Sequence, residues 1–233
     1  MVKINYYNHN LTNQFNLPAS TFSNETKIHF EIEKNKTYSP HYYNKLAIFQ
    51  SESDTEEEII FLGDSITEEG KWSELFPKEN VINRGISSDV TDGVLNRLDE
   101  ITSSNPKKIF LLIGTNDLAR GKEINYVLNV VRKIIVEILK KSKNTSIYLQ
   151  SILPVNPNVG NQFSGHKINH HKIMETNLKL EEMTKLFNIE YIDIHKALRS
   201  SDNYLNHKFT YDGLHLNASG YQKWKQTILK YVN

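Results

Sequence analysis

The sequence of 233 residues is 38% hydrophobic and 24% charged, a composition that allows one compact domain with a full hydrophobic core. Its 28 Lys and Arg residues nearly balance its 27 Asp and Glu residues, and no long basic stripe is present, which argues against a nucleic-acid partner. Cysteine is absent, so disulfides, thiolate metal sites and cysteine nucleophiles are excluded.

The hydropathy of the chain bears on its location. Residues 1–10 lack the uninterrupted apolar run of a secretory signal, and the chain has no run of about 18 apolar residues that could span a membrane. We therefore expect a cytoplasmic protein without a membrane span, although a chain trimmed of its signal peptide would show the same pattern.

Two parts of the sequence differ in pattern. Residues 1–57 are rich in Asn, Tyr, Ser and Glu and show weak periodicity, apart from one short helix predicted by the spacing of Tyr42, Leu46 and Phe49. After them, short apolar runs alternate with longer helical patterns. We predict an N-terminal extension over 1–57 that packs on a single domain formed by 58–233.

The apolar runs of this domain predict buried strands. The first run, Ile-Ile-Phe-Leu at 59–62, is continuous rather than alternating, which suits a strand buried on both faces of a parallel sheet. Segments long enough for crossover helices separate the candidate strands. The further candidates are 81–82, 109–113, 147–153 and 189–194.

Helical stripes lie between and after these strands. One helix is predicted over 127–138, another from about Val90, and a last one with Asn217 as its N-cap. Their apolar residues are Val127, Val130, Val131, Ile134, Ile135 and Ile138, then Val94, Leu95, Leu98 and Ile101, and finally Tyr221, Trp224, Ile228 and Tyr231. Helices on both faces of the sheet give an α/β fold, a three-layer α/β/α sandwich with a central, mostly parallel five-stranded sheet.

Two short motifs carry residues suited to nucleophilic catalysis. Gly-Asp-Ser at 63–65 directly follows the first strand and puts a hydroxyl at the carboxyl edge of the sheet, although alone it is more typical of a turn with a helix cap. In Asp-Gly-Leu-His at 212–215, the three-residue offset lets the carboxylate of Asp212 reach the imidazole of His215 and fix its tautomer. The other ring nitrogen is then free to take a proton from Ser65.

Two more motifs lie at predicted strand ends, Asn-Arg-Gly-Ile-Ser-Ser-Asp at 83–89 and Gly-Thr-Asn-Asp at 114–117. Together with the first two, they resemble the SGNH hydrolase family, also called GDSL esterases and lipases, from roughly Ile59 to the end of the chain. The resemblance implies a flavodoxin-like fold in which Ser65 is the nucleophile, Asn116 donates its side-chain amide to the oxyanion, and Asp212 and His215 complete the triad.

The family's remaining oxyanion donor is a backbone N–H, usually from a glycine just before the aspartate of the second motif. Ser88 occupies that position here. A backbone N–H survives the change, but serine adopts a positive φ less readily than glycine. The resemblance therefore implies an oxyanion hole formed by the N–H groups of Ser65 and Ser88 and the side chain of Asn116.

Other chemistries fit the sequence less well. The nucleophile elbow of α/β-hydrolases, Gly-x-Ser-x-Gly, is absent because Thr67 stands at its last position. His166, His170 and His171 crowd one loop-to-helix segment, but without cysteine or clustered carboxylates nearby they are more typical of a solvated loop than of a metal site. We predict no metal and no cofactor.

Several residues near the motifs have two interpretations. The loop 154–165 follows a strand and is a candidate wall of the substrate site. Arg84 and Arg120 fit either contacts with an acidic substrate or a structural role. Asp64 and Asp117 are expected to brace their loops by hydrogen bonds rather than to titrate in the reaction.

The phrases Asn-Arg-Gly-Ile and Trp-Ser-Glu-Leu-Phe-Pro are similar to the branch of the family near platelet-activating-factor acetylhydrolases and bacterial carbohydrate O-acetylesterases. This similarity implies hydrolysis of acetyl or other short-chain O-esters of small molecules, with carbohydrate as one candidate. A lysophospholipase or thioesterase for longer acyl chains is the alternative. An inactive binding module is disfavoured because all four site residues are present, and the sequence leaves the oligomeric state open.

Overall fold

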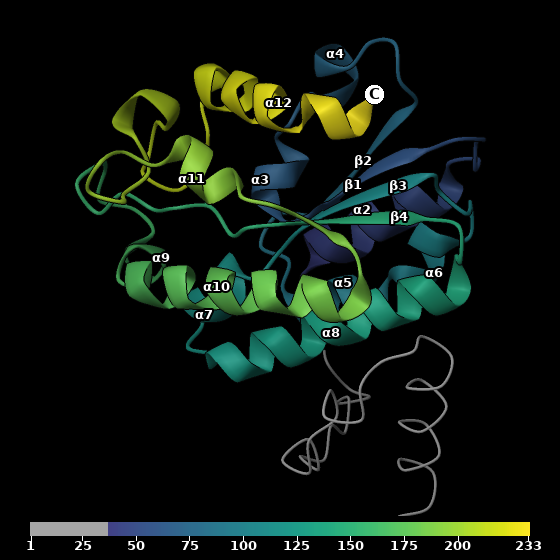
Figure 1. Ribbon diagram of the computed structural model, residues 1–233, viewed down its shortest axis with the longest axis horizontal. Coiled ribbons are helices and arrows are strands. Elements are labelled where there is room, and N and C mark those ends of the chain that lie inside the picture. Colours follow the sequence, from purple (N-terminus) through teal and green to yellow (C-terminus); the bar gives the residue numbers. More distant parts are fainter. Residues whose placement is uncertain (1–36) are drawn as a thin grey trace, which may run out of the picture.

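A central parallel sheet organises the protein. The computed structural model describes residues 37–233, and its strands follow the order β2-β1-β3-β4-β5, with every neighbouring pair parallel (Figure 1). The strands are β1 (Ile59–Gly63), β2 (Val81–Gly85), β3 (Lys108–Leu112), β4 (Ser146–Gln150) and β5 (Glu190–Ile192). The predicted strands are confirmed. However, β4 ends before residue 153. The side chain of Asn177 accepts a hydrogen bond from the N–H of Ile152 at 2.8 Å and donates one to its carbonyl oxygen at 2.9 Å, so these backbone groups are not paired with a neighbouring strand.

Helices cover both faces of the sheet, which confirms the predicted α/β/α sandwich. The helices are α2 (Pro40–Ser51), α3 (Ser65–Glu68), α4 (Trp72–Leu75), α5 (Thr91–Asn96), α6 (Leu98–Thr102), α7 (Thr115–Ala119), α8 (Ile124–Lys141), α9 (Ser164–Lys167), α10 (His170–Phe187), α11 (Ile194–Leu198), η3 (His207–Phe209) and α12 (Ala218–Val232). In Figure 1, α3, α4, α11 and α12 lie on one side of the sheet, and α5, α6, α8 and α10 on the other. Within residues 37–233, no helix combines the length and the hydropathy that a membrane crossing requires.

Aromatic side chains join the sheet to the helices on one face. Phe61 of β1 stacks on Trp72 of α4, with 3.9 Å between the ring centroids, and on Phe110 of β3 at 5.0 Å. Trp224 of α12 packs edge-on against Trp72 at 4.8 Å, and its indole N–H donates to the buried side chain of Gln150 at 2.7 Å. These buried contacts fix α12 on the sheet, and with it the loop that precedes α12.

The helices of the other face follow the sequence prediction in part. All the apolar residues predicted for α8 are buried against the sheet. The single helix predicted from Val90 is wrong, because α5 and α6 are separate helices that meet at Arg97, with φ −109° and ψ 16°. We attribute the break to the fully buried guanidinium of Arg97, which donates to Asp89 at 3.1 Å and to the carbonyl oxygen of Gly63 at 3.2 Å.

The described part of the N-terminal extension packs on the domain through α2. The hydroxyl of Tyr42 donates to the carbonyl oxygen of Gly93 in α5 at 2.8 Å, and the guanidinium of Arg84 lies over the ring of Phe49 at 4.7 Å. The short helix predicted here is confirmed. The domain boundary at residue 57 stays a prediction, and residues 1–36 lie outside the described residues.

Candidate active site

The order of the strands brings three of the predicted site residues to one edge of the sheet. Strand β1 has β2 on one side and β3 on the other, so the strand order reverses its direction at β1. Open α/β sheets bind their ligands at such a switch point. Ser65 follows β1, Ser88 follows β2 and Asn116 follows β3. Because the strands are parallel, all three residues lie beyond the same carboxyl ends, where open α/β sheets bind their ligands.

Ser65 is held at the first position of α3. The side chain of Asp64 caps this helix by accepting a hydrogen bond from the N–H of Ile66 at 3.1 Å. The hydroxyl oxygen of Ser65 lies 3.0 Å from Nε2 of His215, 150 positions later in the chain. The loop before α12 therefore returns to the carboxyl edge of the sheet and presents an imidazole to the serine.

Asp212 orients this imidazole. Its Oδ2 lies 2.7 Å from Nδ1 of His215, and its Oδ1 accepts the backbone N–H groups of Leu214 and His215 at 2.8 Å each. Burial alone would raise the pKa of Asp212, but these hydrogen bonds from the ring and the backbone outweigh it and hold the pKa below its ordinary value. Asp212 is thus a carboxylate at neutral pH, which keeps the proton of a neutral His215 on Nδ1 and leaves Nε2 as an acceptor.

The turn that brings Asp212 to His215 depends on two neighbours that the sequence reasoning did not identify. The hydroxyl of Thr210 donates to the carbonyl oxygen of His215 at 2.6 Å and accepts the N–H of Gly213 at 2.8 Å. Gly213 has φ +89°, and a Cβ there would lie 2.4 Å from the carbonyl oxygen of Asn156. A threonine two residues before the aspartate is a recognised turn-forming residue and was the available signal.

Asn116 and Ser88 face the same edge. The side-chain nitrogen of Asn116, in α7, donates to the carbonyl oxygen of Asp89 at 2.8 Å. Ser88 adopts the left-handed conformation with φ +64°, and its carbonyl oxygen accepts a hydrogen bond from Arg120 at 2.7 Å. Within residues 37–233, neither the N–H of Ser65 nor that of Ser88 has an acceptor, so both remain available as donors.

A comparison with known families decides what kind of protein this is. The model of the GDSL-like Lipase/Acylhydrolase family matches residues 61–223, which includes every residue of the geometry above. The chain belongs to this family. It is therefore a hydrolase that acts on esters, and the family resemblance read from its motifs is confirmed.

Similar proteins agree with this assignment. The chain is 30% identical over 177 residues to the platelet-activating factor acetylhydrolase IB subunit beta homolog of Drosophila melanogaster, covering 71% of this chain and 73% of that protein. A solved structure from Streptococcus pneumonia, named for platelet activating factor, is 31% identical with a TM-score of 0.77, covering 83% of this chain and 93% of that one. An acetyl-xylooligosaccharide esterase from Geobacillus Stearmophilus shares the fold, with a TM-score of 0.61 at 15% identity over 78% of this chain and 96% of that one.

The serine in place of the usual glycine gives the first testable prediction for this hydrolase. If Ser88 donates through its backbone N–H, Ser88→Gly should keep kcat within about threefold, because the donor and the positive φ both survive. Ser88→Val should lower kcat at least about tenfold, because a β-branched residue resists a positive φ. Steady-state kinetics of the two variants on one ester, with circular dichroism as the folding control, check this. Equal rates for the two variants would remove Ser88 from the oxyanion hole.

Three acidic side chains are buried beneath the site and brace its loops. Asp117 accepts both the N–H and the hydroxyl of Thr91, at 3.0 and 2.7 Å, and Asp89 binds Arg97. Burial is the main cause that raises the pKa of Asp64 to about 7, with the nearby Asp89 and Asp117 adding to it and the N–H of Ile66 opposing it. The bracing predicted for Asp64 and Asp117 agrees with these hydrogen bonds, and the pKa of Asp64 is an unexpected addition.

This raised pKa predicts how stability depends on pH. Between the ordinary value of 3.8 and about 7, the unfolded state loses a proton that folded Asp64 keeps, so the free energy of unfolding falls as pH rises through this window. Asp64→Asn keeps the capping oxygen but not this proton. Its Tm, taken relative to the wild type, should therefore rise between about pH 4.5 and pH 7.5. Thermal melts across this range check it, with exposed Asp54→Asn as control. Parallel profiles for Asp64→Asn and the wild type would refute the assigned pKa.

The prediction that the three histidines lie in a solvated loop is wrong, because His166 lies in α9 and the other two lie in the first turn of α10. His170 is buried, and His166 is half-buried with Nε2 3.0 Å from Oδ1 of Asn116, while His171 is exposed. Their spacing in the chain gave no sign that α9 folds back against α7. In the part of the chain that the structure describes, no group of three or more His, Asp or Glu side chains is arranged to hold a metal ion.

The loop that follows β4 lies beside His215. The N–H of Asn156 donates to the carbonyl oxygen of Gly213 at 2.8 Å, and the ring of Phe163 packs edge-on against His215 at 5.0 Å. Tyr211 stacks on His215 from another side at 6.1 Å. Phe163 and Tyr211 remain 38% and 58% exposed, so both rings border the site without closing it.

The two arginines beside the motifs bind protein groups. Arg84 donates to Glu52 and Glu100 at 2.6 Å each, and Arg120 donates to Ser88 as described.

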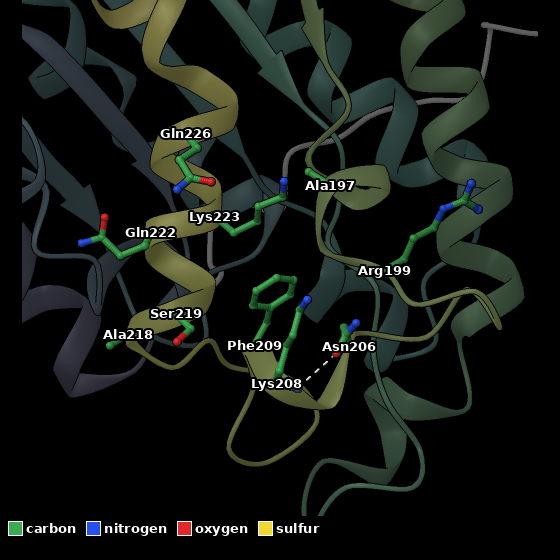
Figure 2. Close-up of a pocket in the computed structure, with 10 residues that line it drawn as sticks. All are labelled: Ala197, Arg199, Asn206, Lys208, Phe209, Ala218, Ser219, Gln222, Lys223 and Gln226. Atoms are coloured by element: carbon green, nitrogen blue, oxygen red, sulfur yellow. Dashed lines mark hydrogen bonds between the residues drawn. The ribbon is translucent and has the colours of Figure 1, made fainter.

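A separate pocket lies between α11, η3 and α12, where Figure 2 shows Lys208, Phe209 and Lys223 among its lining side chains. None of the candidate catalytic residues lines this pocket, so it is not part of the candidate active site.

Proposed function

We propose that this hydrolase cleaves esters of acetyl or another short acyl group through a Ser-His-Asp mechanism. The observation that carries the proposal is the continuous chain of contacts from Asp212 through His215 to Ser65, with distances of 2.7 and 3.0 Å. All three residues are less than a tenth exposed, which strengthens their mutual interactions. This arrangement is what a serine hydroxyl needs to become a nucleophile near neutral pH.

The proposed reaction runs in two steps. The hydroxyl oxygen of Ser65 attacks the ester carbonyl carbon, and its proton passes to Nε2 of His215. The N–H groups of Ser65 and Ser88 and the amide of Asn116 donate to the oxyanion that forms. His215 then returns the proton to the departing alcohol oxygen as the carbon–oxygen bond breaks. A water molecule, deprotonated by His215, releases the acyl group from Ser65 by the same steps in reverse.

The surroundings of His215 support a ring-shaped alcohol as the leaving group. Because His215 protonates the departing oxygen, the alcohol half of the ester lies beside its ring. The exposed rings of Phe163 and Tyr211 border that position and offer apolar faces to a sugar ring. The acetylhydrolase names of the curated relatives support a short acyl group. We therefore propose O-acetylated carbohydrate as the substrate class.

The acyl preference is tested with p-nitrophenyl acetate, butyrate and octanoate. The proposal predicts a kcat/KM that falls as the chain lengthens, and release of acetate from an acetylated oligosaccharide by the wild type but not by Ser65→Ala. A kcat/KM that rises toward octanoate would replace the proposal with the longer-chain lysophospholipase or thioesterase function. No hydrolysis of any ester by the wild type would refute it.

A further inference from the structure

One histidine outside the family motifs contacts the candidate oxyanion hole. His166 belongs to α9, which begins at Ser164, within the predicted loop 154–165, and packs against α7. Its Nε2 lies 3.0 Å from Oδ1 of Asn116, 50 positions earlier in the chain. This contact joins the side chain of His166 to the residue proposed to donate to the oxyanion.

The hydrogen bonds around Asn116 fix which way its amide points. A carbonyl oxygen only accepts hydrogen bonds, so the group 2.8 Å from the carbonyl oxygen of Asp89 must be the NH₂ of Asn116. The amide oxygen then faces His166, whose Nε2 must carry the hydrogen. One N–H of Asn116 is occupied by Asp89, its oxygen is occupied by His166, and its second N–H is left for the substrate.

The environment of His166 suits a neutral donor. Burial, followed by the nearby His215 and Arg120, lowers the pKa of His166, and Asp212 partly opposes this shift. A neutral His166 does not repel the imidazolium that forms on His215 during the reaction. The ring of Phe163 packs edge-on against both imidazoles, at 5.8 Å from His166 and 5.0 Å from His215, which limits their movement.

From this geometry we propose that His166 is a positioning residue for Asn116, an inference that rests on the proposed function. Its Nε2–H holds the amide oxygen away from the developing oxyanion and keeps the second N–H of Asn116 aimed at it. Without this bond, of the two hydrogen bonds that hold the amide, the one to the carbonyl oxygen of Asp89 is left, and because the terminal torsion of the amide is broad, its second N–H is less firmly aimed at the oxyanion. The donation also polarises the amide and strengthens its remaining N–H as a donor.

The kinetic test compares two substitutions of His166 on p-nitrophenyl acetate. His166→Leu removes the donor, so kcat should fall about tenfold with KM within about twofold, a smaller loss than deletion of the oxyanion donor itself. His166→Gln keeps an N–H donor and should recover most of that loss. His171→Leu, a change at an exposed neighbour, is the matched control and should leave both constants unchanged. An unchanged kcat in His166→Leu, or equal losses in the Leu and Gln variants, would overturn the proposal.

A double-mutant cycle separates positioning from general damage. In the Asn116→Ala background, His166→Leu should change kcat less than about twofold, because the group it orients is gone. A full tenfold loss in that background would show that His166 does not act through Asn116.

A substrate-free measurement keeps this inference distinct from the proposed function. Nitrogen-15 NMR of the histidine rings of the resting enzyme should show His166 with its proton on Nε2, and Asn116→Ala should change that signal. A proton on Nδ1 would overturn the inference even if the enzyme hydrolyses esters. Absence of ester hydrolysis with the Nε2–H form intact would refute the proposed function and leave the hydrogen bond standing.

Discussion

Ser65→Ala is expected to lower kcat for ester hydrolysis by about 10⁴ to 10⁶-fold. The hydroxyl of Ser65 lies 3.0 Å from Nε2 of His215, the position from which it would form the acyl intermediate of the proposed reaction. Removing it leaves the proposed oxyanion donors in place, so a small residual rate over the uncatalysed reaction should remain. Stopped assays at high enzyme concentration, with KM measured alongside, check this.

The control for this prediction is another serine of the same region. Ser73→Ala changes an exposed serine in α4 and should leave kcat and KM unchanged. Both variants should keep the thermal stability of the wild type to within about 1 kcal/mol in the free energy of unfolding, because neither substitution opens a large cavity. A Ser65→Ala enzyme with more than a tenth of the wild-type kcat would remove Ser65 from the reaction.

Asn116→Ala is expected to lower kcat by about 10² to 10³-fold with little change in KM. The side-chain amide of Asn116 is held by Asp89 and His166 before any substrate arrives, so it needs no reorganisation when the oxyanion forms. Exposed Asn125→Ala in α8 is the matched control and should behave as the wild type. A rise in KM of that size with no fall in kcat would indicate that Asn116 binds the substrate in the ground state instead of stabilising the oxyanion.

The sequence predicted the fold well where the pattern was local. The continuous apolar run at the start of the domain became the fully buried β1, and the three-and-four spacing from Val127 to Ile138 became the buried face of α8. The single helix predicted from Val90 is wrong because Arg97, in its middle, donates hydrogen bonds to the side chain of Asp89 and to the carbonyl oxygen of Gly63. A contact of that kind depends on the folded chain and leaves no trace in helical periodicity.

The candidate site divides in a similar way. The motifs predicted the pairing of Asp212 with His215 because the two are close in the chain. They also placed Ser65 and Asn116 at strand ends, and the structure adds the strand order that makes those two strands neighbours. The sequence reasoning did not predict the part played by His166. The fold of the loop before α9 brings His166 onto Asn116, and the sequence of the segment that holds the three histidines carries no information about that path.

Covalent labelling of Ser65 is the most direct test of the central claim that this residue is an activated nucleophile. The enzyme is treated with a fluorophosphonate, which reacts with activated serine hydroxyls, and the labelled peptide is located by mass spectrometry. We predict one label per chain, on Ser65, formed in step with the loss of esterase activity, and strongly slowed in a His215→Ala variant. A label on another residue, or full activity after Ser65 has been labelled, would contradict the account.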